Sequence, residues 1–166
     1  MLVPAALTIA AIVATALVIG FMLLTYARFG IYATLALIFN ILMILGAMAL
    51  FNATLTLPGI AGFVLTIGAA VDANVLINER IREEQRRGRN IYQSVDLGYK
   101  EASRAIFDAN VTNVIAAAIM FAFGSGPIRG FAVVLLIGIV TSVFTAVNFT
   151  RMLVALWIKR KRPRVL

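Results

Sequence analysis

Five stretches of this sequence are each apolar over about the length that crosses a lipid bilayer, and this feature most constrains the fold. They cover residues 3–26, 31–51, 57–78, 106–123 and 130–157. A transmembrane helix needs about 20 mainly apolar residues. Because lipid offers no hydrogen bonds to the backbone, each stretch must satisfy its own backbone groups as a helix. The sequence therefore predicts an all-α, polytopic membrane helix bundle of about five transmembrane helices, forming a single transmembrane domain over residues 1–166.

The overall composition agrees with a chain whose solvent is the bilayer. Hydrophobic residues make up 62% of the sequence and charged residues 13%, whereas a soluble domain is about 45–50% apolar and about 25% charged. The N-terminal stretch lacks the basic segment of a signal peptide and is longer than the apolar core of one. We therefore interpret residues 3–26 as a membrane span.

Basic residues gather in the connections that five spans would place on one side of the membrane. Thirteen of the fifteen Lys and Arg residues are Arg28, members of the loop 79–105, or members of the tail 158–166. The connections on the other side contain only Arg129. By the positive-inside rule, the loop, the tail and the C-terminus are cytoplasmic and the N-terminus lies outside. This clustering also argues against nucleic-acid binding, which a net charge of +8 would otherwise suggest.

The sequence contains neither cysteine nor histidine. Their absence removes thiolate chemistry, the commonest metal ligand and the commonest general base. We therefore expect no enzymatic activity, no catalytic residue, no metal and no cofactor.

The loop 79–105 is expected to contain two helical segments. Charged residues at spacings of three and four extend the third apolar stretch into water as a helix, and Gly88 is expected to end it. Beyond Asn90, apolar residues recur every three or four positions up to Ile106. That second segment is either an amphipathic helix on the membrane surface or a helix packed on another cytoplasmic element.

Asp72 is the most informative single residue, because it lies about one helical turn inward of the centre of the third stretch. An aspartate there costs about 2.5–3.5 kcal/mol, and such a residue normally faces the bundle interior and serves an ion or proton path. Gly68 and Ala69 lie one turn before it and allow a neighbouring helix to approach closely. The alternative is an aspartate that only hydrogen-bonds another helix.

Further polar residues accompany Asp72. Asn74 and Asn78 follow on the same helix, where interhelical hydrogen bonds worth about 0.6 kcal/mol each are an equally simple role. The run Val-Asp-Ala-Asn-Val at 71–75 recurs as Phe-Asp-Ala-Asn-Val at 107–111, which contains Asp108 and Asn110. We expect Asp108 to lie in the first turn of the fourth helix, where the helix dipole favours its charge and a structural role.

Several motifs occur in the order that is typical of one family. They are LPGIAG at 57–62, IG at 67–68, VDANVLI at 71–77, ERIREE at 79–84, DANVT at 108–112 and GPIRGFA at 126–132. Together they resemble the membrane half of the SecD family of bacterial protein-export subunits. The resemblance covers essentially the whole chain.

This resemblance implies membership of the resistance-nodulation-division (RND) superfamily, with the chain forming half of an RND-type transmembrane domain in the bacterial inner membrane. It implies a SecF-like subunit and the SecYEG channel as partners, and use of the proton gradient to assist translocation of an unfolded polypeptide. Asp72 matches the intramembrane acid proposed to carry protons in the family. A full SecD has a further helix and large periplasmic domains ahead of this region, so we expect a fragment or a split gene product.

Two other functions are compatible with parts of the sequence. One is another proton-coupled exporter of the RND superfamily, which moves lipids or small molecules. The other is an intramembrane enzyme, which would need a second acid or a nucleophile deep in the membrane. Asp108 is the only other acid near a span, so the enzyme is the weaker alternative.

Overall fold

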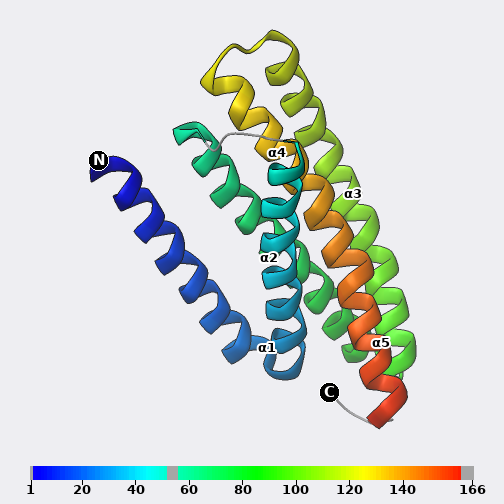
Figure 1. Ribbon diagram of the computed structural model, residues 1–166. Helices are drawn as coiled ribbons and strands as arrows, with labels where there is room; N and C mark the ends of the chain where they lie inside the picture. The colour runs from blue at the N-terminus through cyan, green and yellow to red at the C-terminus, as the bar shows by residue number, and fades with distance from the viewer. Residues whose placement is uncertain (1, 52–55, 162–166) are drawn as a thin grey trace.

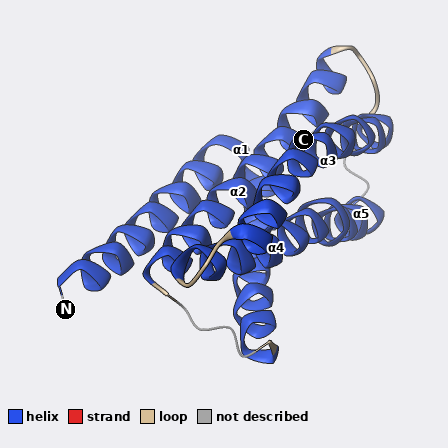
Figure 2. Cartoon of the chain, turned by 90° about the horizontal axis from the view of Figure 1, so that it is seen from above, coloured by secondary structure: helices blue, strands red, loops and turns tan. Residues whose placement is uncertain are grey.

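The computed structural model describes residues 2–51 and 56–161, and all regular structure in these ranges is helical. The connections at residues 87–90 and 124–126 are short loops (Figure 2). The elements in chain order are α1 (Leu2–Leu50), α2 (Leu57–Arg86), α3 (Ile91–Phe123), α4 (Pro127–Phe144), the π-helix η1 (Thr145–Phe149) and α5 (Thr150–Lys161). Four helical stretches of the described chain are long and apolar enough to cross a membrane, at residues 8–50, 57–86, 91–123 and 127–160.

The first helix accounts for two of the predicted spans. A straight helix of the 49 residues of α1 would be about 70 Å long, more than twice the thickness of a bilayer core of about 30 Å. Ala27 breaks it with a φ of 45° and a ψ of −109°, and the chain reverses direction there (Figure 1). A Cβ on Gly30 would lie 2.8 Å from the carbonyl carbon of Met22, so the reversal requires glycine at that position. The predicted fold class, a helical membrane bundle of about five spans, is confirmed.

The connections alternate between the two ends of the bundle (Figure 1). The break at Ala27, the turn at 87–90 and the end of α5 lie at one end. The start of α1 and the connection at 124–126 lie at the other. The basic connections within the described chain therefore share one end, as the charge distribution predicts.

The charged continuation of the third span is confirmed. Helix α2 begins after Thr56, whose hydroxyl accepts a hydrogen bond from the Gly59 amide at 3.2 Å. It continues to Arg86, and Gly88 follows it with a φ of 82°. Salt bridges between residues three or four apart, such as Arg82–Glu79 at 3.1 Å, lie along this charged end. The pairs whose two side chains are exposed add little to stability, whereas Arg87 pairs with the buried Glu84.

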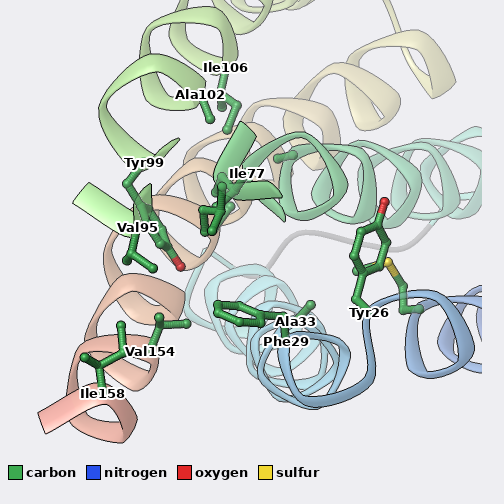
Figure 3. Packing of buried hydrophobic residues seen from close by; sticks show 14 of the residues in the cluster. Tyr26, Phe29, Ala33, Ile77, Val95, Tyr99, Ala102, Ile106, Val154 and Ile158 are labelled. Carbon is green, nitrogen blue, oxygen red and sulfur yellow. The ribbon is translucent and has the colours of Figure 1, made fainter. Parts of the chain in front are cut away.

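Helix α3 resolves the two alternatives for the second half of the loop. It is one continuous helix that begins at Ile91, directly after Asn90, whose side-chain oxygen accepts a hydrogen bond from the Gln93 amide at 2.9 Å. Its apolar face packs against α2 and α5 rather than lying on a membrane surface (Figure 3). The buried residues of this contact are Ile91, Val95, Tyr99, Ala102 and Ile106 of α3, Ile77 and Ile81 of α2, and Val154 and Ile158 of α5.

Helices α2 and α4 form the centre of the bundle, because each packs against the other and against both α1 and α3. Helices α2 and α4 come close where Gly138 faces Thr66: a Cβ added at Gly138 would lie 2.5 Å from the Cβ of Thr66. Small residues at such a crossing allow two helix backbones to come close. The last span then continues through η1 into α5.

Candidate functional site

The polar residues of α2 lie on two opposite faces. Successive residues of an α-helix are about 100° apart, so Asp72 and Asn74 differ by about 200° and cannot share a face. Asn74 and Asn78, four residues apart, are both buried, with 3% and 5% of their surface exposed. Asp72 is exposed. The sequence grouped these three residues, but the structure brings together only the two asparagines.

The expectation that Asp72 faces the interior of this bundle is wrong. The inner face of α2 is filled by other residues, among them Thr66, Ala70 and Asn74, which turns Asp72 outward. Within residues 2–51 and 56–161, no hydrogen bond or salt bridge involves Asp72. Gly68 and Ala69 are exposed beside it, as is Leu65.

The surface around Asp72 is unsuited to lipid and suited to a second helix. A charged aspartate at mid-span is unfavourable in hydrocarbon by about 2.5–3.5 kcal/mol, whereas the neighbouring Gly68 and Ala69 leave space for close helix packing. We define the Asp72 face as Ala61, Leu65, Gly68, Ala69 and Asp72, all of which are exposed on α2.

Asn74, on the opposite face, ties α2 to the last span. Its amide nitrogen donates to the Ala70 carbonyl at 3.0 Å, and the Thr150 hydroxyl donates to its side-chain oxygen at 3.3 Å. The same hydroxyl lies 3.0 Å from the carbonyl of Thr145, the first residue of η1. Sequence reasoning missed Thr150, because nothing in the residue pattern marks a π-helical turn. Asn74 therefore has a structural role in joining α2 to α5.

Asn78 differs from Asn74, because its amide nitrogen has no hydrogen-bond partner within the described chain. It lies four residues further towards the charged end of α2 and lines a cavity beside the break in α1. A buried polar group without a partner is unusual in a native structure. Asn78 is thus not explained by helix packing.

The run Phe-Asp-Ala-Asn-Val at 107–111, which nearly repeats residues 71–75 of α2, also has an exposed aspartate and a less exposed asparagine. Asp108 is exposed, whereas Asn110 is partly buried and donates to the Ile106 carbonyl at 2.7 Å. The prediction that Asp108 lies in a first turn is wrong, because α3 begins at Ile91 and Asp108 is in its middle. The helix dipole acts only near the ends of a helix, so it cannot stabilise this charge. Asp108 instead lines a polar cavity between α3 and α5 with Lys100 and Arg151.

Asp72 is the only acidic side chain of the described residues that the structure places within the apolar part of α2. Within residues 2–51 and 56–161, no group of three or more acidic, histidine or cysteine side chains is placed to hold a metal ion. Asp72 combines a titratable group with a mid-span position and an uncovered, small-residue surface. These features define a polytopic helical membrane protein with an exposed carboxylate within an apolar span.

The family follows from sequence comparison. Residues 3–160 match the model of the family described as protein export membrane protein SecD/SecF, C-terminal. The chain belongs to this family, and the resemblance that its motifs indicate is confirmed.

Individual relatives agree with this assignment. The chain is 52% identical over 158 residues to the protein translocase subunit SecD of Anaeromyxobacter dehalogenans, an alignment that covers 95% of this chain and 26% of that protein. It is 59% identical over 137 residues to SecD of Rhodothermus marinus, covering 82% of this chain and 22% of that protein. The chain thus spans about a quarter of the length of these relatives.

A solved structure has the same fold. It is the crystal structure of SecDF, a translocon-associated membrane protein, from Thermus thermophilus. The TM-score is 0.90 at 41% sequence identity, and the match covers 96% of this chain and 22% of that one. The helical arrangement described above is therefore that of a known membrane region of the family.

Proposed function

We propose that this chain acts as part of a SecD-like subunit of the protein-export machinery in the bacterial inner membrane. In this proposal it uses the proton gradient to assist translocation of an unfolded polypeptide, and Asp72 is the proton carrier. Family membership and the names of the relatives support the role in export. The observation that carries the mechanism is the exposed mid-span position of Asp72 on the Asp72 face.

The physical basis is the change in charge of one carboxyl group. A protonated Asp72 is a neutral hydrogen-bond donor and acceptor, whereas the charged form only accepts hydrogen bonds. Each form therefore stabilises a different arrangement of the helices that cover it. Moving one proton across 100 mV supplies about 2.3 kcal/mol, which is enough to shift such an equilibrium about fifty-fold. The measurement that tests the proposal is the rate of secretion of a reporter protein, with and without an uncoupler, in cells carrying wild-type or Asp72→Asn protein.

The proposed partner on the Asp72 face is a SecF-like subunit. An uncovered carboxylate between small residues needs a protein surface rather than lipid around it. The SecYEG channel is a further proposed partner, and the exported polypeptide is expected to be contacted through the periplasmic domains of a full SecD. This assignment is supported by the description of the solved relative as a translocon-associated SecDF protein.

A bulky residue on the Asp72 face should separate this chain from its partner. We expect Ala69→Trp to reduce recovery of a co-purified SecF-like protein at least severalfold, because the exposed Ala69 side chain would lie in the contact. Leu17→Trp is the matched control, since Leu17 lies on the part of α1 before the break at Ala27 and is 70% exposed. Equal recovery of the partner with both variants would contradict the proposed interface.

The basic end of the bundle is proposed to face the cytoplasm. The chain has no native cysteine, so single cysteines can report accessibility to an impermeant thiol reagent. We expect Ser125→Cys to be labelled in intact cells and Gln93→Cys to be labelled only after the membrane is opened; both native side chains are exposed. Labelling of Gln93→Cys in intact cells would refute the orientation.

A further inference from the structure

A polar cavity lies where the break in α1 meets the charged end of α2. Residues 25–29 of α1 form one wall, and Asn78, Ile81, Arg82 and Gln85 of α2 form the other. None of these residues belongs to the Asp72 face. The cavity is therefore separate from the proposed proton site.

Arg82 holds the two walls of the cavity together. Its guanidinium donates to the Thr25 carbonyl at 2.5 Å and to the Glu79 carboxylate at 3.1 Å. It also lies 4.5 Å from the centre of the Tyr26 ring, within the range of a favourable cation–π contact. These contacts hold the break in α1 against the end of α2, so the cavity is preformed.

The lining of the cavity is rich in hydrogen-bond donors and positive charge. Arg28 and Arg82 line it, whereas no acidic residue among the described ones does so. Arg28 is exposed and forms no salt bridge within residues 2–51 and 56–161. The nearby Glu79 is paired with Arg82. A ligand of this cavity is therefore expected to be an anion.

Asn78 provides the second, independent indication of a ligand. It is 5% exposed, and its amide nitrogen has no acceptor among the described residues although it lies at the cavity. Buried donors in native proteins are normally paired with protein, water or ligand. The nitrogen itself is enclosed, so a rotation of the Asn78 side chain would bring it to an anion beside Arg28, which would then supply the missing acceptor.

The position of the cavity along the bundle indicates the chemistry of that anion. Ile77 ends the apolar stretch of α2, and Arg28 is the first charged residue of the chain. The cavity therefore lies at the depth where apolar spans give way to charged residues, the level of lipid headgroups. Arginine suits phosphate oxygens because its guanidinium offers several donors in one plane. We propose that this cavity binds a phosphate group, carried by an anionic phospholipid headgroup or present as free phosphate.

The test measures thermal protection by phosphate-bearing compounds. The protein, in its native assembly in dodecyl maltoside, is heated with phosphatidylglycerol, with diacylglycerol of the same acyl chains, or with inorganic phosphate. The fraction remaining in the folded peak is measured by size-exclusion chromatography. We expect phosphatidylglycerol to protect the protein and diacylglycerol not to protect it. In Arg28→Gln the apparent affinity for phosphatidylglycerol should fall about tenfold or more, because one charge-assisted hydrogen bond is lost.

Two further variants make the result specific. Asn78→Leu should also weaken protection, and since it replaces an unpaired amide by an apolar group of similar size it should leave the ligand-free protein as stable as before. Arg160→Gln removes the same charge from the exposed end of α5 and should leave the affinity unchanged. Saturable protection by inorganic phosphate alone, lost in Arg28→Gln, would assign the site to free phosphate. Protection that is absent, or equal in Arg28→Gln, Asn78→Leu and Arg160→Gln, would overturn the proposal.

Discussion

Replacing Asp72 by asparagine is expected to leave the protein assembled and to abolish the part of export that the proton gradient drives. Asparagine has nearly the same size and hydrogen-bonding groups, but it cannot take up or release a proton. The conformational equilibrium then loses the contribution of about 2.3 kcal/mol per 100 mV, so the gradient-dependent rate should fall by up to about fifty-fold. The measurement is secretion of a reporter protein with and without an uncoupler.

Two further acid variants control this experiment. Asp72→Glu keeps a titratable carboxyl group and should retain part of the activity. Asp108→Asn removes the other exposed acid of the motif, which lies on α3 in a polar cavity, and should have a milder effect. Asp72 is not the proton carrier if the Asn variant exports at the wild-type rate and still responds to the uncoupler.

Gly138→Ala is expected to destabilise the bundle, because it adds a methyl group to the close contact between α2 and α4. The new Cβ would lie 2.5 Å from the Cβ of Thr66, and no rotation of the Thr66 side chain can relieve a clash with its Cβ. Helices α2 and α4 must therefore move apart, at a cost of about 1–3 kcal/mol, which is typical of an overpacked core. Because α2 also contains Asp72, we expect the same variant to lower export.

The matched control adds the same methyl group where space is available. Gly46 is exposed on the part of α1 after the break at Ala27, and a Cβ added there would meet no atom within 4 Å. Gly46→Ala should be neutral or stabilise the helix by up to about 1 kcal/mol. Unfolding in SDS can be followed through the fluorescence of Trp157, the single tryptophan. The centre of its ring lies 6.0 Å from the centre of the Phe29 ring. An unchanged midpoint for Gly138→Ala would contradict the close α2–α4 contact.

Helical periodicity already separates Asp72 from Asn74, since residues two positions apart in the sequence lie about 200° apart around a helix. It does not say which of them faces the bundle. Small residues occur on both faces of α2, with Gly62 and Ala70 buried and Gly68 and Ala69 exposed. The choice is made by partners distant in the chain, Thr150 on α5 and Gly138 on α4. The interior position expected for Asp72 was wrong for this reason.

The sequence alone determined the features that depend on local free energy. The transfer of apolar side chains into lipid and the internal pairing of backbone groups act residue by residue. The helical class and the number of spans could therefore be predicted. The positions of the charged residues in turn placed the basic connections at one end. The tertiary structure alone decided the outward direction of Asp72, the unbroken α3, the π-helix η1 and the cavity beside Asn78. These features depend on packing between residues far apart in the chain, which local patterns do not contain.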